Sequence, residues 1–332
     1  MNKGTFTCID AHTCGNPVRV ITNPVPVLHG NNMSEKRQDF IKNHDWIRKG
    51  LMFEPRGHDM MSGGFIYPPC SIDTDASILF IETSGCLPMC GHGTIGIVTI
   101  AIEHGLIIPK VSGQLSLDVP AGKLKINYEV KDKKVTSVKF YNVPSYLAYQ
   151  NIEIDCTGLG KITFDLAYGG NYYAIIDPQK NFPGLDKFST SEILHYSPII
   201  RELANQLVKP VHPLDPTVKG VSHVLWTGVA KKPQSTSANA VFYGEKAIDR
   251  SPCGTGTSAR MAQWHAKGWL KTGEQFIHES IIGSQFIGCA EEQTKVGDYP
   301  AIIPSIQGWA KIYGQNVITI DDDDPFAFGF TV

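Results

Sequence analysis

Hydrophobic and polar residues alternate with a period of two along much of the chain, in segments rich in β-branched residues. This alternation is typical of strands whose two faces meet different surroundings. Turn-forming residues bound each segment, which sets where the strands end. We therefore expect strands at Thr5–Asp10, Ala76–Glu82, Gln114–Val119, Leu124–Tyr128, Val135–Tyr141 and Ala238–Tyr243.

Helical periodicity is confined to fewer segments. Met33–Leu51 is expected to form a helix that opens at a Ser34 cap, and Ser191–Lys209 a second helix that is disturbed at Pro198. Two more apolar-periodic stretches follow two of the cysteines. Many strands and few helices, without strict alternation of the two, predict the α+β class.

Two segments of the chain share the pattern C-G-x-G-T. One begins at Cys90 and the other at Cys253, about half the chain away. Each follows a strand-like run and leads into an apolar-periodic stretch that ends 15 residues after the cysteine, at Gly105 and at Gly268. Glycine at that position suits a left-handed helix cap. The shared motif, helix length and half-chain placement predict two similar domains, each with one cysteine at a helix start.

A glycine-rich turn into a helix is a binding site for anions. The first backbone N–H groups of the helix have no acceptor within it, and the helix dipole favours negative charge there. Neither segment has the lysine of a phosphate-binding loop or the full G-x-G-x-x-G pattern of a dinucleotide site. A small carboxylate therefore matches these turns better than a nucleotide does.

A cysteine at a helix start is expected to have a lowered thiol pKa, because the dipole favours the thiolate. The alternative, a buried and inert thiol, is reasonable for one cysteine but does not explain two equivalent ones. Two similar domains that face each other would place Cys90 and Cys253 on opposite sides of a shared cleft. One thiolate could then remove a proton from a carbon while the opposite thiol delivers one to the other face. The helix starts would stabilise the charge that develops on the substrate carboxylate.

Charge and composition exclude several other classes of protein. The net charge is −2 and there is no Lys/Arg block, so neither a nucleic acid nor an anionic membrane has electrostatic support. The N-terminus lacks a secretory apolar stretch, which favours a cytoplasmic protein whose eight cysteines are mostly reduced. Cys86, Cys90 and His92 are close in sequence, but no second ligand cluster with standard spacing accompanies them. We therefore expect no metal.

Here the motifs lead to a known family. MCGHGTIG at 89–96 and DRSPCGTGT at 249–257 resemble the signature motifs of the proline racemase family. The likeness extends along most of the chain, including DAHTCGNPVRV at 10–20 and EPRGHDMMSGG at 54–64. It is closest to the bacterial branch that epimerises 4-hydroxyproline, with LFIETSGCLPMCGHGTIG and FIHESIIGS as further matching stretches.

The resemblance implies a fold and a reaction. The fold is the diaminopimelate-epimerase-like one, with two pseudo-symmetric domains, each a mixed or antiparallel sheet around a central helix. We expect residues 1–142, together with 318–332, to form the half that carries Cys90, and residues 143–317 the half that carries Cys253. The reaction is the interconversion of trans-4-hydroxy-L-proline and cis-4-hydroxy-D-proline, with proline racemisation as the alternative. Similar proteins that dehydrate trans-3-hydroxyproline lack one of the two cysteines, and both are present here.

The resemblance also implies the roles of particular residues. Cys90 and Cys253 match the proton acceptor and donor, which exchange roles with substrate handedness. Asp249 matches the residue that holds the ring nitrogen, although it could also only cap the turn before Cys253, and His223 matches a substrate contact. The positions that hold the substrate carboxylate are matched by Gly91, His92, Gly254 and Thr255. The implied enzyme uses neither pyridoxal phosphate nor metal, takes a small-molecule substrate and forms a homodimer.

Three functions of other classes stay open at the level of sequence. A thiol hydrolase would need a Cys–His pair with an orienting group, and His92 is close to Cys90 in sequence for that role. An amino-acid-binding protein without turnover would use the same carboxylate-binding turns. A redox sensor would use the thiols alone. The hydrolase leaves the duplicated cysteine unexplained, whereas a cleft between two domains would also suit the binding protein.

Overall fold

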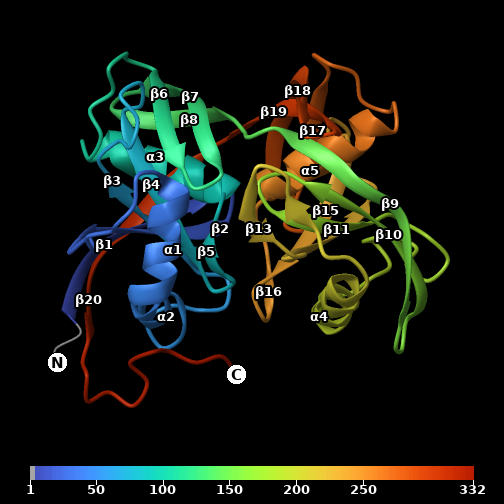
Figure 1. Ribbon diagram of the computed structural model, residues 1–332, viewed down its shortest axis with the longest axis horizontal. Helices are drawn as coiled ribbons and strands as arrows, with labels where there is room; N and C mark the ends of the chain where they lie inside the picture. Colours follow the sequence, from blue (N-terminus) through green and yellow to red (C-terminus); the bar gives the residue numbers. More distant parts are fainter. Residues whose placement is uncertain (1–3) are drawn as a thin grey trace. The chain divides into compact units, whose positions relative to one another are not determined.

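The computed structural model describes residues 4–332, which divide into two compact units (Figure 1). Unit 1 comprises the chain up to Phe140 and returns with Gly308–Val332, and unit 2 is Tyr141–Gln307. The last strand, β20 (Ala310–Ile320), belongs to unit 1 because it pairs with β1 (Gly4–Thr13) from end to end. The boundaries of the catalytic halves expected from the sequence stay predictions.

Unit 1 is a mixed sheet that packs around helix α3. The strands hydrogen-bond in the order β20-β1-β2-β3-β4-β6-β7, and β5 forms a hairpin with β4. The pairs β2–β3 and β4–β6 are parallel and the others antiparallel. Helix α3 packs on β1, β2, β3 and β20, while α1 and α2 lie against β4 and β5. The elements are β1 (Gly4–Thr13), β2 (Asn16–Asn23), α1 (Met33–Asn43), α2 (Asp45–Met52), β3 (Ser62–Tyr67), β4 (Ala76–Glu82), β5 (Gly85–Leu87), α3 (Gly91–Glu103), β6 (Gln114–Val119), β7 (Gly122–Lys131), β8 (Lys134–Tyr141) and β20 (Ala310–Ile320).

Unit 2 is a sheet that closes on itself around helix α5. Its strands pair in the order β9-β10-β11-β14-β15-β17-β18-β19, and β19 pairs again with β9. Helix α5 packs on β9, β10, β11 and β18, and α4 covers β9, β14 and β15. The elements are β9 (Ser145–Cys156), β10 (Gly160–Tyr168), β11 (Tyr172–Ile176), α4 (Thr190–Leu207), β12 (Val211–His212), β13 (Asp215–Lys219), β14 (His223–Gly228), β15 (Ser237–Tyr243), β16 (Ala247–Ile248), α5 (Gly254–Ala266), β17 (Gln275–Glu279), β18 (Gln285–Val296) and β19 (Tyr299–Gly308).

The two units repeat one topology. In unit 1 the parallel pairs β2–β3 and β4–β6 alternate with antiparallel pairs, and in unit 2 the parallel pairs β11–β14 and β15–β17 do the same. The short hairpin strands β5 and β16 occupy equivalent places, directly before the enclosed helix. This equivalence confirms the predicted α+β fold with two pseudo-symmetric domains, each wrapped around a helix.

All six expected strands are confirmed, because each falls within β1, β4, β6, β7, β8 or β15. The single helix expected at Met33–Leu51 is wrong. The backbone leaves the helical conformation at His44, with φ −130° and ψ 3°, so α1 and α2 are separate. The cap of α1 is Asn32 rather than Ser34, since the Asn32 side chain accepts a hydrogen bond from the Glu35 N–H.

Helix α4 also differs from expectation at its start and at its proline. A capping box between Ser189 and Glu192 starts the helix at Thr190, one residue before the expected start at Ser191. The helix then continues through Pro198 to Leu207. Within residues 4–332, no helix has both the length and the apolar character needed to cross a membrane.

Candidate active site

Each of the two repeated cysteines is the N-cap residue of the helix enclosed by its own unit. Cys90 precedes α3 and Cys253 precedes α5, as the repeat predicts. The helices end as predicted too, because Gly105 and Gly268 lie just beyond the caps with φ values of 65° and 75°. The expected common element, a strand, a tight turn with cysteine and a 13-residue helix, is therefore present in both units.

The second glycine of each motif is required by the position of the sulfur. A Cβ atom at Gly93 would lie 2.8 Å from Cys90 Sγ, and one at Gly256 would lie 3.0 Å from Cys253 Sγ. Any larger residue at these positions would displace the sulfur. The motif therefore fixes each thiol against the first turn of its helix, where the Gly93 N–H donates to Cys90 Sγ at 3.3 Å.

Cys90 is buried beside two further polar side chains. Its Sγ lies 3.1 Å from Glu82 Oε1 and 3.6 Å from His92 Nδ1. Glu82 is the last residue of β4, a strand buried at every position, and it is itself only 3% exposed. Burial raises the pKa of Glu82, while hydrogen bonds from Cys90 and Ser84 partly oppose the rise. The carboxyl group can therefore hold or release a proton next to the thiol.

The ring of His92 is held in place from its far side. Nε2 lies 2.6 Å from Ser62 Oγ and 3.1 Å from Asn16 Nδ2, so Nδ1 faces the Cys90 sulfur. From the sequence, His92 was considered too close to Cys90 to pair with it as a base. In the structure, the His92 ring does face the Cys90 sulfur.

Cys253 has different neighbours, all from unit 2. Its Sγ lies 3.3 Å from Tyr173 Oη on β11 and 3.9 Å from Thr255 Oγ1. The two hydroxyls contact each other at 2.5 Å. His223, at the start of β14, stacks on the ring of Tyr173 with 4.7 Å between ring centroids. Of the predicted residues, Thr255 therefore lies beside Cys253 itself, and His223 packs on Tyr173, which contacts the thiol. The sequence analysis did not identify Tyr173.

The thiol of Cys253 does not follow the expectation of a lowered pKa. Burial in a core cluster with Tyr173 and Leu225 raises its pKa strongly, and the charge of Asp249 adds to the rise. Hydrogen bonds from Tyr173, Gly256 and Thr255 only partly oppose it. Cys253 also has a φ of 60°, in the left-handed region that non-glycine residues rarely occupy. In this unit desolvation outweighs the helix dipole, and the thiol is protonated.

Asp249 is buried and shapes the turn before Cys253. Its Oδ1 accepts hydrogen bonds of 2.8 Å from both the N–H and the Oγ of Ser251. Ser251 Oγ in turn accepts from the Cys253 N–H at 3.2 Å. Asp249 therefore has the structural role considered from the sequence, in the turn before Cys253, and a role toward substrate remains a proposal.

One group of side chains in the described part of the chain has the geometry of metal ligands. Glu82, Cys90 and His92 each offer a ligand atom, and these atoms lie within 4.8 Å of one another. Cys86, which the sequence analysis considered with Cys90, is a free, buried thiol that is not part of this group.

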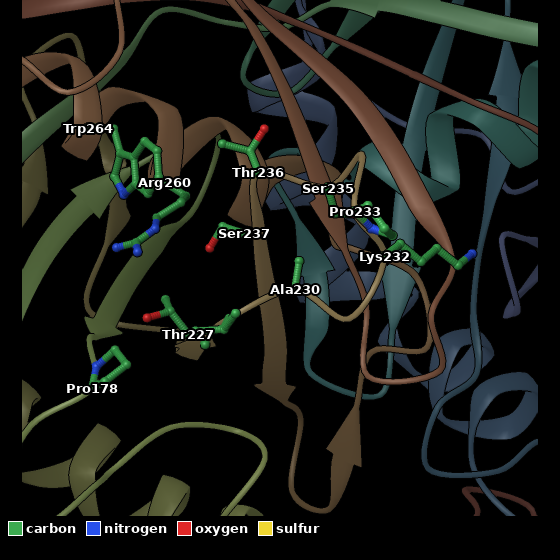
Figure 2. Close-up of a pocket in the computed structure, with 12 residues that line it drawn as sticks. Pro178, Thr227, Ala230, Lys232, Pro233, Ser235, Thr236, Ser237, Arg260 and Trp264 are labelled. Carbon is green, nitrogen blue, oxygen red and sulfur yellow. The ribbon is translucent and has the colours of Figure 1, made fainter.

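A pocket of about 360 Å³ opens in unit 2 near the other end of α5 (Figure 2). Arg260 and Trp264 of α5 line one side, and Thr227, Ser237 and the loop between β14 and β15 line the other. Neither Cys253 nor any residue predicted for the site lines this pocket. It is therefore separate from the thiol at the start of the helix.

Comparison with known proteins agrees with this architecture. A 4-hydroxyproline 2-epimerase of Shewanella loihica is 64% identical over 332 residues, which is the whole of both chains. A 4-hydroxyproline 2-epimerase of Spirosoma linguale is 60% identical over 98% of each chain. Among solved structures, a hydroxyproline epimerase from Agrobacterium vitis with bound trans-4-hydroxy-L-proline matches with a TM-score of 0.91 and 28% identity, covering 100% of this chain and 96% of that one. A phenazine biosynthesis protein of Bacillus anthracis, at 15% identity and a TM-score of 0.57, shares the fold.

The repeated sheet around a helix, with a cysteine at each helix start, is thus the architecture of an isomerase of the racemase and epimerase class. The sequence model described as proline racemase matches residues 8–331. The chain belongs to the proline racemase family.

Proposed function

We propose that this enzyme epimerises 4-hydroxyproline at its α-carbon, interconverting trans-4-hydroxy-L-proline and cis-4-hydroxy-D-proline. The observation that carries the proposal is the 64% identity, over the full length of both chains, to a protein named 4-hydroxyproline 2-epimerase. The more distant solved relative with bound trans-4-hydroxy-L-proline supports the same substrate.

In the proposed mechanism, Cys90 and Cys253 act on opposite faces of the α-carbon. The thiolate of one removes the α-proton, and the thiol of the other returns a proton to the opposite face, which inverts the centre. The reverse reaction exchanges the two roles. Each sulfur is held at a helix start by its glycine-rich turn, which supports equivalent functions for the two groups.

The first turns of α3 and α5 are proposed to hold the substrate carboxylate through the amides of Gly91 and His92, and of Gly254 and Thr255. These amides come first in their helices, where no carbonyl of the same helix can accept from them. Negative charge builds up on the carboxylate as the α-proton leaves, and the helix dipoles stabilise that charge. Asp249 is proposed to hold the ring nitrogen, and His223 to contact the substrate.

The two thiols have different neighbours. This difference suits a reaction whose two substrates, trans-4-hydroxy-L-proline and cis-4-hydroxy-D-proline, are not mirror images of each other. Cys90 has Glu82 and His92 as proton-accepting partners, whereas Cys253 has the hydroxyls of Tyr173 and Thr255. In the resting enzyme we therefore assign the base to Cys90 and the acid to Cys253, whose pKa is raised by burial.

Proline racemisation is the second candidate reaction, because the family model is described by that name. The test is to incubate the enzyme separately with trans-4-hydroxy-L-proline and with L-proline and to follow products by chiral chromatography. We expect kcat/KM for 4-hydroxyproline to exceed that for proline by more than about tenfold, since losing the hydrogen bond to the ring hydroxyl leaves its buried partner unsatisfied at a cost of about 1–3 kcal/mol. Equal or higher kcat/KM for proline would overturn the substrate assignment, and binding without product would indicate an amino-acid-binding protein.

Further predictions extend beyond the reaction itself. We propose that turnover needs no cofactor or metal, so that activity survives exhaustive chelation and carbonyl reagents but falls on thiol alkylation.

We also propose that the enzyme is a homodimer, that it is located in the cytoplasm, and that it has no nucleic-acid or membrane partner. Light scattering of the purified chain tests the dimer.

A further inference from the structure

The Glu82–Cys90–His92 cluster contains the three kinds of ligand that zinc accepts in proteins, a thiolate sulfur, an imidazole nitrogen and a carboxylate oxygen. Their separations can be compared with those in a metal site. Bonds of about 2.3 Å to sulfur and about 2.0–2.1 Å to nitrogen or oxygen, arranged tetrahedrally, place the ligand atoms about 3.5 Å apart. Cys90 Sγ lies 3.1 Å from Glu82 Oε1 and 3.6 Å from His92 Nδ1. The third separation, between the carboxylate and imidazole ligand atoms, is at most 4.8 Å, so an ion would fit after a shift of up to about 1 Å in one side chain.

The ligands are also held in suitable orientations. Coordination through His92 Nδ1 requires the tautomer with a proton on Nε2, and Ser62 Oγ, 2.6 Å away, can accept that proton because its own hydroxyl donates to the Pro17 carbonyl. The Asn16 amide, whose nitrogen lies 3.1 Å from Nε2, would then turn over to present its oxygen to the same proton. Ser84 Oγ donates to Glu82 Oε2 at 2.9 Å, which leaves Oε1 directed at the sulfur. Partners of this kind orient the ligands in known metal sites.

The charges balance as well. A thiolate on Cys90 and a carboxylate on Glu82 together carry two negative charges, which a divalent cation neutralises within a buried site. The thiol proton, and any proton on the carboxyl group, would leave to solvent on binding. Three protein ligands leave a fourth position open to water, as in zinc sites that are not purely structural.

The other cysteine provides an internal comparison. Cys253 has hydroxyl neighbours, Tyr173 and Thr255, rather than imidazole and carboxylate. In the part of the chain that the structure describes, the cluster at Cys90 is the one group with ligand geometry. Metal binding should therefore discriminate between two thiols that occupy equivalent places in the fold.

We propose that Glu82, Cys90 and His92 form a site for a thiophilic divalent cation such as Zn²⁺ or Cd²⁺, and that the ion inhibits the enzyme by occupying Cys90. Binding rests on the cluster alone, whereas inhibition rests on the proposed function. The cation competes with catalysis because a metal-bound thiolate cannot accept the α-proton of the substrate.

The test is a titration with Cd²⁺, followed by the ultraviolet charge-transfer absorption of the cadmium–thiolate bond. The protein carries Cys70→Ser and Cys289→Ser, because those two thiols are partly exposed and would bind cadmium on their own. We expect one Cd²⁺ per chain in this background and in its Cys253→Ser derivative, and no band with Cys90→Ser. Ser62→Ala should weaken binding by about 10–100-fold by freeing the imidazole to turn. Glu82→Gln should weaken it at least as much.

Two outcomes would overturn the proposal. A band that persists in Cys90→Ser, or that disappears equally in Cys253→Ser, would place the metal elsewhere. Stoichiometric binding at Cys90 without loss of turnover would refute inhibition while leaving the binding site. Because the absorption band does not depend on turnover, failure of the proposed substrate assignment would leave the binding result intact.

Discussion

Glu82 Oε1 lies 3.1 Å from Cys90 Sγ, with both side chains buried in unit 1. A carboxyl group at this distance can accept the thiol proton or return it. Cys253 Sγ is instead contacted by the hydroxyls of Tyr173 and Thr255. The two thiols thus share a backbone motif and differ in their proton partners.

Glu82→Gln removes this partner while keeping the size of the side chain. We expect kcat/KM to fall by about 10² or more, since a positioned acid–base group contributes about 10²–10⁴-fold. The low-pH limb of the kcat/KM profile should shift as well, which a merely structural role would not cause. Ser84→Ala, which removes the other hydrogen bond to Glu82, is the matched control and should have a smaller effect. An unchanged pH profile in Glu82→Gln would remove Glu82 from the reaction.

The same substitution should change how stability depends on pH. Burial raises the pKa of Glu82, so the folded chain binds this proton more tightly than the unfolded chain does. The resulting stabilisation is complete below the unfolded pKa and is lost as the pH rises through the raised folded pKa. Glutamine does not titrate, so wild type should lose stability relative to Glu82→Gln as the pH rises above the unfolded value of about 4.3, which measurements at about pH 4 and about pH 8 sample. Urea unfolding of both proteins at these two pH values measures the difference, and a constant difference would contradict it.

Tyr173 and Asp249 should shift the reactivity of Cys253 in opposite directions. The Tyr173 hydrogen bond lowers the thiol pKa and the Asp249 charge raises it. Tyr173→Phe should therefore slow alkylation of Cys253 at a fixed pH, and Asp249→Asn should accelerate it, both in a Cys90→Ser background. Peptide mapping by mass spectrometry reports the rate at this one residue. Shifts in the same direction for both variants would show that these contacts do not set the pKa.

Asp249→Asn also separates the two roles considered for this residue. Asparagine keeps the Oδ1 acceptor that binds Ser251, so the turn and the thermal stability should change little. Loss of the charge should raise KM and lower kcat, because charge-assisted hydrogen bonds are about twice as strong as neutral ones. Steady-state kinetics in both reaction directions provide the measurement. If the kinetics are those of wild type, Asp249 serves only the turn.

The role of the second glycine of each motif can be tested by substitution with alanine, which adds a single methyl group. Gly93→Ala and Gly256→Ala would place a methyl group 2.8 Å and 3.0 Å from the respective sulfur atoms. Each should reduce kcat by about 10², the cost of misplacing a reacting group by about 1 Å. Gly314→Ala is the control, because its nearest neighbour beyond the adjacent residues is 3.9 Å away. Full activity in both motif variants would show that the sulfur positions are not critical.

The sequence was sufficient to predict six of the strands, the repeat and the starts of α3 and α5, because each has a local signature. The C-G-x-G-T pattern and the glycines at 105 and 268 encode backbone geometry that only nearby residues determine. Glu82 and Tyr173 were not identified, because their contacts with the cysteines are set by strand pairing across the sheet rather than by spacing along the chain. A signal for Glu82 did exist, since a carboxylate ends a strand that is otherwise apolar from Ile78 onward.

Other expectations failed where tertiary contacts compete with local preference. The helix dipole alone favours a thiolate at Cys253, yet burial in the core of unit 2 raises the pKa instead. The break between α1 and α2 at His44 follows no proline or glycine, so periodicity alone could not locate it.

The most direct test of the two-thiol account is NMR of trans-4-hydroxy-L-proline in deuterium oxide with wild type, Cys90→Ser and Cys253→Ser. Wild type should form cis-4-hydroxy-D-proline with deuterium at the α-carbon. Each serine variant should lose about 10²–10⁴-fold in epimerisation rate while retaining the circular dichroism spectrum of the folded protein. If either variant keeps more than about a tenth of the wild-type rate, proton transfer does not require both sulfurs and the account is wrong.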